Sequence, residues 1–203
     1  TLILLPMLLI IMQRETGSAL VYLAFFLMLY REGMPGSILF TGISVVAYFV
    51  IGIRFGHDLM PDGCTFIGEF AVFTLITVLS ALLVNVYCEK KKVFRNILLY
   101  HGGTIVLALL FSIYVIPFNL IYFLYIECAG LVIYLLYLSF HERVMNYFYI
   151  ALFAIGSVGF LYSADYVFEE VLEPHQRIRI EVLLGMEEDL AGAGYNVNQS
   201  KIA

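Results

Sequence analysis

The stretch that decides the fold is residues 97–140, ILLYHGGTIVLALLFSIYVIPFNLIYFLYIECAGLVIYLLYLSF. A helix needs about 20 apolar residues to cross a bilayer core of roughly 30 Å, so this run is too long for one crossing. Pro117, Phe118 and Asn119 stand near its middle, and proline with asparagine is typical of a tight turn. We therefore expect two membrane-spanning helices joined as a hairpin.

Similar apolar runs extend through most of the chain. Hydrophobic residues make up 62% of it and charged residues 13%, with a mean hydropathy of +0.94, whereas a soluble domain is nearer half apolar and a quarter charged. We expect an all-α, polytopic transmembrane bundle with a partly helical extracytoplasmic loop at its C-terminal end. A membrane barrel would show short alternating segments instead. About seven spans are expected, at residues 1–12, 18–30, 37–53, 67–88, 97–116, 119–140 and 147–163.

The remaining composition excludes several classes of protein. A formal net charge of −5 argues against nucleic acid as a partner. The three cysteines have no spacing that suits a metal, and we interpret them as small apolar side chains. The chain starts at Thr1 inside an apolar run and ends soon after Ser200, so we expect it to be an internal piece of a longer protein.

Lysine and arginine residues indicate which loops face the cytoplasm. The densest cluster is residues 89–95, EKKKVFR, and placing it inside together with Arg31 and Arg143 gives a consistent alternation of every loop. The final segment, residues 164–203, then lies outside, which is the periplasm in a bacterium with two membranes. The outer side would hold the remaining cations, Arg14, Arg54, Arg177, Arg179 and Lys201.

Several polar residues fall within or at the ends of the apolar runs. An ionisable group at membrane depth costs about 2.5–3.5 kcal/mol on insertion scales, so it usually faces protein or water. Glu127 is the deepest of them. We interpret it as a neutral, hydrogen-bonded carboxyl between helices, with an ion or proton path as the alternative. For His101-Gly102-Gly103 we expect a close helix contact through the small residues.

Residues 173–203 form the longest polar segment of the chain. We expect a surface element from Leu172 to Leu184, either an amphipathic helix that starts at Pro174 or a strand. Arginine binds phosphate as a fork and lysine binds it as a point charge, while a carboxylate can take a proton from a hydroxyl nucleophile. The cations and acids of this segment therefore suit a diphosphate substrate, and a solvated acidic loop is the competing interpretation.

This segment contains three characteristic runs, QRIR at 176–179, EDLAGAGYN at 188–196 and QSKIA at 199–203. They resemble the large periplasmic loop of the SEDS family of peptidoglycan glycosyltransferases, and the lysine after Gln-Ser is more similar to the family's elongation branch than to its division branch. The loop at residues 13–18, QRETGS, also resembles the family's Gln-Pro-Asp-x-Gly-Thr connection. The resemblance covers about residues 1–50 and 145–203.

The resemblance implies a reaction and a set of partners. The family polymerises lipid II, a disaccharide-peptide on undecaprenyl diphosphate, in the bacterial cytoplasmic membrane. Asp189 would be the general base on the acceptor hydroxyl, and a class B penicillin-binding protein transpeptidase would be a partner. No cofactor is certain, and a divalent cation at the diphosphate is left open. The implied substrate-binding residues are Gln13, Glu15, Arg177, Arg179, Gln199 and Lys201.

This chain departs from the family pattern in two ways. Arg14 and Glu15 stand where the family has proline and aspartate, and Leu190-Ala191 replaces Pro-Leu. Between Arg31 and Gln176 this chain has five predicted spans, whereas family members usually have one span between the matching positions. Because four extra crossings are an even number, the C-terminal loop stays on the same side of the membrane as in the family. The resemblance thus divides the chain into family-like helices at 1–53, inserted helices at 54–146, a family-like helix at 147–163 and a truncated catalytic loop at 164–203.

Two other functions are compatible with the sequence. One is a transporter or flippase for a lipid-linked precursor, with Glu15 and Glu127 in its path. The other is a membrane scaffold for a partner transpeptidase. Because the later helices of the family are missing, we also expect the isolated chain to be inactive as an enzyme.

Overall fold

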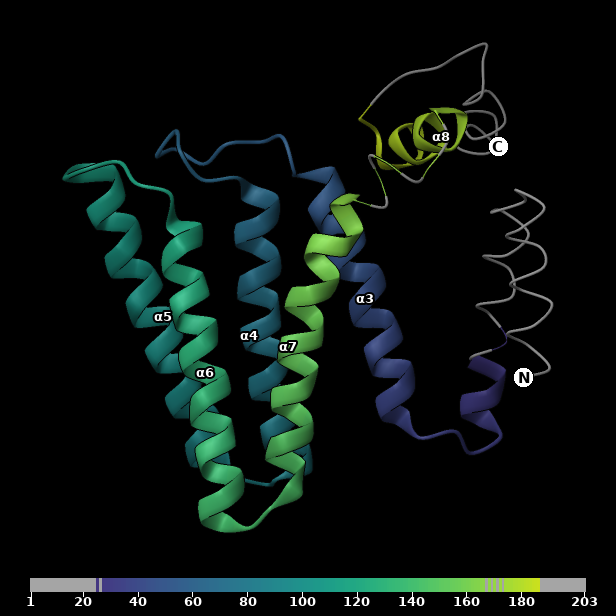
Figure 1. Ribbon diagram of the computed structural model, residues 1–203, viewed down its shortest axis with the longest axis vertical. Helices are drawn as coiled ribbons and strands as arrows, with labels where there is room; N and C mark the ends of the chain where they lie inside the picture. The colour runs from purple at the N-terminus through teal and green to yellow at the C-terminus, as the bar shows by residue number, and fades with distance from the viewer. Residues whose placement is uncertain are drawn as a thin grey trace. The chain divides into compact units, whose positions relative to one another are not determined.

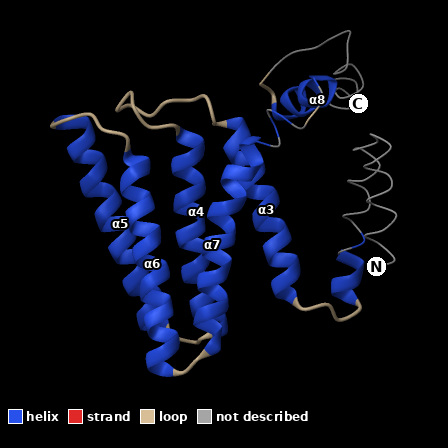
Figure 2. Ribbon diagram, in the orientation of Figure 1, coloured by secondary structure: helices blue, strands red, loops and turns tan. Residues whose placement is uncertain are grey.

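The computed structural model describes residue 25, residues 27–166, residues 168, 170 and 172, and residues 174–186. Within these residues the fold is all-helical and contains no strand, apart from an isolated bridge between Leu59 and Phe66 (Figure 2). The chain divides into two compact units, Thr1–Val46 and Ala47–Ala203, and each is described by itself.

The first unit contains a helical segment at residues 27–31 and the beginning of α3, which spans Gly36–Arg54 and continues into the second unit. Gly33 connects the two with a φ of 105°, a conformation that glycine adopts without strain. The predicted span at 1–12 lies outside the described residues, and only the end of the span at 18–30 lies within them.

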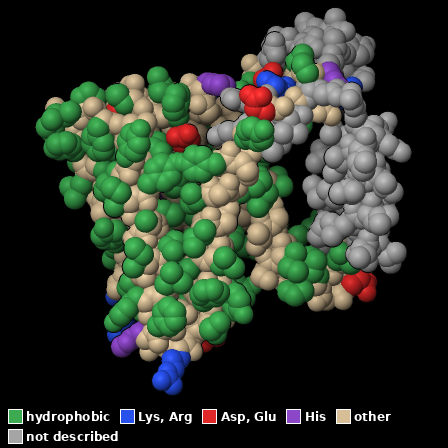
Figure 3. Space-filling model, viewed as in Figure 1, with side chains coloured by type: hydrophobic (Ala, Val, Ile, Leu, Met, Phe, Trp, Pro, Cys, Tyr) green, Lys and Arg blue, Asp and Glu red, His purple; other side chains and the backbone are tan. Residues whose placement is uncertain are grey.

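Among the residues that the structure describes, five helices are long and apolar enough to cross a membrane, which confirms five of the predicted spans. After α3 they are α4 (Ile67–Tyr87), α5 (Lys91–Tyr114), α6 (Leu120–Glu142) and α7 (Met145–Tyr166). Large hydrophobic side chains cover their surface (Figure 3), and Phe140, for example, is 81% exposed. A soluble protein seldom exposes large continuous apolar patches, so this surface fits contact with lipid, and the protein is a multi-pass membrane protein.

The hairpin predicted around Pro117 is confirmed. Helix α5 ends at Tyr114 and α6 begins at Leu120. The side chain of Asn119 caps α6, because its Oδ1 accepts a hydrogen bond of 2.9 Å from the backbone N–H of Ile121. This bond satisfies one of the N–H groups that a helix start leaves without an intrahelical partner.

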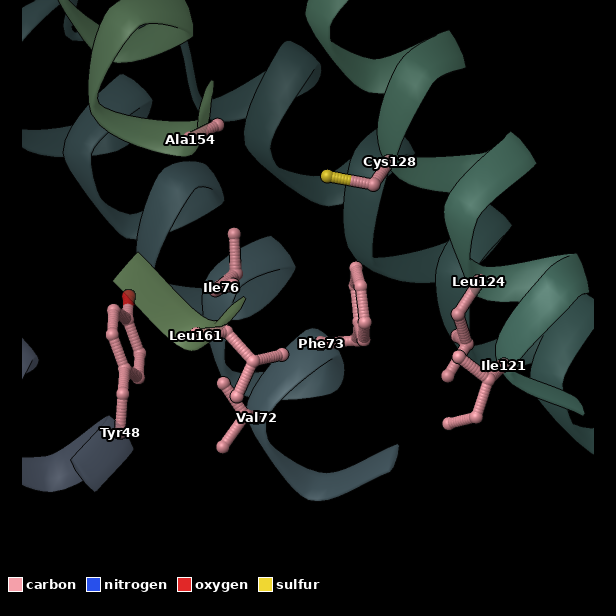
Figure 4. Close-up of a cluster of buried hydrophobic side chains, with 9 residues drawn as sticks. All are labelled: Tyr48, Val72, Phe73, Ile76, Ile121, Leu124, Cys128, Ala154 and Leu161. Atoms are coloured by element: carbon pink, nitrogen blue, oxygen red, sulfur yellow. The ribbon is translucent and has the colours of Figure 1, made fainter. Parts of the chain in front are cut away.

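Helix α4 is the centre of the second unit and packs against α5, α6 and α7 (Figure 1). Half of the most apolar part of α4 is buried inside the structure, compared with 22% of the corresponding part of α5. Small side chains recur along α4 every three residues, which lets neighbouring helices approach closely; they are Gly68, Ala71, Thr74, Thr77 and Ser80. A buried apolar cluster surrounds α4 (Figure 4) and consists of Tyr48, Val72, Phe73, Ile76, Ile121, Leu124, Cys128, Ala154 and Leu161.

A close approach of two backbone segments in the second unit is at the start of α4. A Cβ atom placed on Gly68 would lie 2.8 Å from the carbonyl oxygen of Gly52 and 2.9 Å from the carbonyl carbon of Phe55. Backbone atoms cannot move away as a flexible side chain can. Gly68 is therefore required for α4 to pack against the end of α3.

Polar contacts tie together the connections at one end of the bundle. Lys90 Nζ lies 2.9 Å from Glu142 Oε2, and Asn146 Nδ2 donates a 2.7 Å hydrogen bond to the carbonyl of Tyr87. Helix α7 runs from this end to the opposite one, so the chain leaves α7 at the end that holds the loop before α4 (Figure 1). It continues into α8, Pro174–Leu184, which confirms the predicted helix and excludes the strand alternative for these residues.

Candidate functional site

The site residues predicted from the sequence fall mostly outside the described part of the chain. Only Arg177 and Arg179 lie within it, both on α8. The other five, Gln13, Glu15, Asp189, Gln199 and Lys201, lie outside the described residues.

The two described arginines project from different sides of α8. Successive residues of an α-helix are turned by about 100°, so side chains two positions apart point in nearly opposite directions. Arg177 is half-buried, and its Nε donates to the carbonyl of Leu172 at 3.4 Å, whereas Arg179 is exposed. The helix therefore presents the two guanidinium groups to different surroundings.

Helices α5 and α6 bring a histidine and a glutamate together within the membrane-spanning bundle. His101 Nδ1 lies 2.9 Å from Glu127 Oε1, and both side chains are only 5% exposed. Thr104, one turn along α5 from His101, places its hydroxyl 3.1 Å from the same carboxylate oxygen. Glu127 is thus a hydrogen-bonded carboxyl between helices, as predicted from the sequence.

The polar pair is not fully satisfied by the protein. Within the described part of the chain, neither His101 Nε2 nor Glu127 Oε2 has a hydrogen-bond partner. A buried polar atom without a partner costs about 1–3 kcal/mol. Such atoms are uncommon in native structures and require an explanation.

A cavity of about 460 Å³ lies against this pair, with Thr77 of α4 in its wall. No lysine or arginine lines it. Its wall contains exposed side chains of the bundle surface, including Tyr100 at 65% and Ile126 at 73%. Helix α5 contributes Asn96, Ile97, Tyr100 and His101, and α6 contributes Phe123, Ile126, Glu127, Gly130, Leu131 and Tyr134.

The partner of Glu127 was not predicted from the sequence. No second ionisable group lies at helical spacing nearby along the same helix, and His101 is 26 residues away on the neighbouring helix. The expectation of a close helix contact at Gly102 and Gly103 is wrong, because a Cβ at either position would meet no atom within 4 Å. The sequence did contain a signal for this pair, because each of the two predicted hairpin helices has an ionisable residue, His101 in the first and Glu127 in the second.

A second polar cluster lies in the loop between α3 and α4 and centres on Asp62, which is buried. Its Oδ1 accepts hydrogen bonds from the backbone N–H groups of Cys64 and Thr65, at 3.0 and 3.1 Å. Its Oδ2 accepts from the hydroxyls of Thr65 and, on α5, Ser112. Thr65 in turn accepts a 3.0 Å hydrogen bond from the N–H of Leu120 at the start of α6. The cluster fastens this loop to the α5–α6 connection.

Protonation of Asp62 would weaken this cluster. Burial alone would raise the pKa of its carboxyl, but the hydrogen bonds from Thr65, Cys64 and Ser112 favour the ionised form and together hold the pKa below its usual value. The arrangement accounts for Asp62 as a structural residue.

The fold and these clusters define a multi-pass helical membrane protein with a buried His–Glu pair beside a cavity. Among the described residues, no group of three or more histidine, cysteine, aspartate or glutamate side chains is placed to hold a metal ion. Comparisons with models of known protein families, with curated proteins and with solved structures found no match to this chain.

Proposed function

We propose that this chain belongs to a RodA-like peptidoglycan glycosyltransferase that polymerises lipid II in the bacterial cytoplasmic membrane during cell elongation. The observation that carries the proposal is the order of three sequence runs, QRIR at 176–179, EDLAGAGYN at 188–196 and QSKIA at 199–203. They combine the groups that transfer of a glycosyl diphosphate needs: cations for the leaving diphosphate and a carboxylate for the nucleophile.

In the proposed reaction, Asp189 takes the proton from the 4-hydroxyl of the acceptor sugar. The hydroxyl oxygen attacks the anomeric carbon of the donor strand and forms the new glycosidic bond. The bond from that carbon to the diphosphate breaks, and undecaprenyl diphosphate leaves with the electron pair. Lys201 and the two arginines of α8 stabilise its negative charge.

The arrangement of the bundle supports an outer position for this segment. Lys90, Lys91 and Lys92 lie at the end where α4 joins α5, and Arg143 lies where α6 joins α7. These cations favour the cytoplasmic side for that end. Because the chain leaves α7 at the opposite end, α8 and the residues after it would lie in the periplasm, where lipid II is polymerised.

The difference in exposure of the two arginines of α8 supports different tasks for them in the proposed reaction. Arg179 is exposed and is the better placed of the two to reach a diphosphate in solution. Arg177 is half-buried against the carbonyl of Leu172, so it also holds the segment that precedes the helix. We expect Arg179→Ala to weaken lipid II binding directly and Arg177→Ala to act partly through the position of α8.

The test compares Asp189→Asn with the neighbouring change Glu188→Gln, each introduced into the whole protein that includes this chain. Formation of glycan strands from fluorescent lipid II is followed by gel electrophoresis, and lipid II binding is measured separately. Because general-base catalysis contributes about 10²–10⁴-fold, Asp189→Asn is expected to lower polymerisation at least about 100-fold and to keep lipid II binding. Glu188→Gln should keep both. Unchanged polymerisation by Asp189→Asn would refute the proposal.

The described cavity does not favour the transporter alternative. A diphosphate that crosses the membrane needs cations along its path, but the cavity beside Glu127 is lined by no lysine or arginine. Apart from tyrosines, the ionisable side chains in the wall of this cavity are His101 and Glu127. These two already contact each other.

A further inference from the structure

We propose that the cavity between α5 and α6 binds the hydroxyl head and upper tail of a neutral long-chain lipid, which enters from the bilayer. The site belongs to residues 54–146, which the SEDS resemblance does not cover, and no step of the proposed polymerisation uses it. Its ligand is a lipid alcohol, either a simple long-chain alcohol or a diacylglycerol.

The polar end of the site is the His101–Glu127 pair. His101 Nε2 and Glu127 Oε2 are both buried without a partner in the described chain, and both residues line the cavity. Whether Nε2 is a donor or an acceptor depends on the tautomer of the imidazole. A hydroxyl group donates one hydrogen bond and accepts others, so it can satisfy the pair in either state after a small shift of the side chains.

The charges of the site select a neutral head. A phosphate or carboxylate head would place a negative charge at membrane depth beside Glu127, with no lysine or arginine in the cavity wall to balance it. An ammonium head would compete with His101 for the carboxylate, which is already 2.9 Å from Nδ1. A buried charge without a partner costs several kcal/mol, so a neutral head is favoured.

The rest of the cavity suits a hydrocarbon tail. Apart from the pair, its wall is mainly aromatic and aliphatic, with Phe123 and Leu131 on α6. Tyr100 and Ile126 line it and are also largely exposed on the bundle surface, which faces lipid. A volume of about 460 Å³ lies within the roughly 300–1,000 Å³ typical of small-molecule sites.

The chain offers a matched pair of glycines for the test. Gly130 lines the cavity and Gly102 does not. Both lie in helices, both are exposed, and a Cβ at either meets no atom within 4 Å. Gly130→Leu therefore fills the cavity, whereas Gly102→Leu adds the same side chain elsewhere on the same helical pair.

The experiment uses the whole protein that includes this chain, in lipid nanodiscs, and photoreactive probes that differ in the head. The probes are a long-chain alcohol, a diacylglycerol and a phosphatidylglycerol, and labelled peptides are identified by mass spectrometry. We expect α5 and α6 to be labelled by at least one of the two alcohols and not by the phospholipid. Labelling should fall at least 5-fold in Gly130→Leu and in His101→Phe, and remain unchanged in Gly102→Leu.

Competition provides a readout that does not depend on the folding of any variant. Unlabelled long-chain alcohol should displace the probe from the wild-type chain, whereas an alkane of the same length should not. Equal displacement by the alkane, equal labelling by phosphatidylglycerol, or full labelling of Gly130→Leu would overturn the proposal. Comparison of the labelling by the long-chain alcohol with that by the diacylglycerol shows which of these two lipids the cavity prefers.

Discussion

Replacement of the His101–Glu127 pair gives the sharpest test of the bundle described for α4–α7. The two side chains come from different helices and meet at 2.9 Å with 5% exposure each. Glu127→Leu or His101→Phe alone removes one partner and leaves the other buried with a further polar atom unsatisfied. The double change replaces both with apolar side chains that the bundle can pack.

The magnitude follows from the burial of the pair. Loss of a buried hydrogen bond with an orphaned partner costs about 1–3 kcal/mol, and more where the orphaned group is charged. Each single change should therefore lower the free energy of unfolding by about 3 kcal/mol. Because replacing a whole buried pair by apolar residues is often neutral or stabilising, the double variant should lose less than either single one.

Cys128 provides a native reporter for this measurement. It is buried, and it is the only one of the three cysteines in the core cluster. In a background with Cys64→Ser and Cys88→Ser, a thiol-reactive dye should label Cys128 only when the bundle opens. Labelling is followed as the protein in detergent is heated or exposed to increasing denaturant.

The two single variants and the double variant form a double-mutant cycle, which measures the coupling free energy between positions 101 and 127. A favourable coupling of at least about 2 kcal/mol between the two positions is expected from their contact. If the two single effects simply add in the double variant, the side chains do not interact, and the pairing of α5 with α6 described above is wrong.

Two further predictions concern the other polar cluster and the close helix approach. Asp62→Asn should lower the free energy of unfolding by about 2 kcal/mol at neutral pH, because charge-assisted hydrogen bonds are lost. The hydrogen bonds lower the pKa of Asp62 in the folded state. The ionised carboxyl therefore contributes its full stabilisation above the pKa of the unfolded chain, about 3.9. This stabilisation is lost as the pH falls through the lower pKa of the folded state. Denaturation followed from pH 7 down to about pH 2 should therefore show a smaller acid effect in Asp62→Asn, and an unchanged acid effect would contradict this role. Gly68→Ala should cost at least about 2 kcal/mol, because its Cβ would overlap the backbone of Gly52. Gly159→Ala, whose Cβ meets nothing within 4 Å, should gain about 0.5–1 kcal/mol, and equal effects of the two changes in thermal unfolding would contradict the packing.

The parts of the fold that could be predicted are those set by local sequence. The apolar runs determine the helices, Pro117 and Asn119 determine the hairpin turn, and Pro174 begins α8 where expected. Each of these depends on a few neighbouring residues, so a single sequence contains the information. The spans at 67–88, 119–140 and 147–163 differ from the observed helices by at most three residues at either end.

The contacts between helices could not be predicted in the same way. His101 and Glu127 are separated by 26 residues, and Asp62 and Ser112 by 50, so no periodicity within one helix connects them. Similarly, Gly68 and Gly102 look alike in the sequence, but only Gly68 lies against another backbone. Small residues permit a close approach of two helices, but the sequence alone does not show which face of a helix packs against a neighbour.

The position of the C-terminal segment relative to the membrane is the central claim, and two native cysteines can test it. Cys64 is exposed and lies in the loop at the end of the bundle where the chain leaves α7. Cys88 is half-buried at the opposite end, beside Lys90. Burial, and next the negative charge of Glu142, raise the pKa of the Cys88 thiol, so its labelling will be slow and must be compared with permeabilised cells.

The decisive measurement is labelling of intact spheroplasts with a membrane-impermeant maleimide, in variants that keep only Cys64 or only Cys88. The account predicts that Cys64 is labelled in intact spheroplasts and that Cys88 is labelled only after permeabilisation. The reverse pattern would place α8 and Asp189 in the cytoplasm, out of reach of a periplasmic lipid-linked sugar, and would contradict the proposed polymerase.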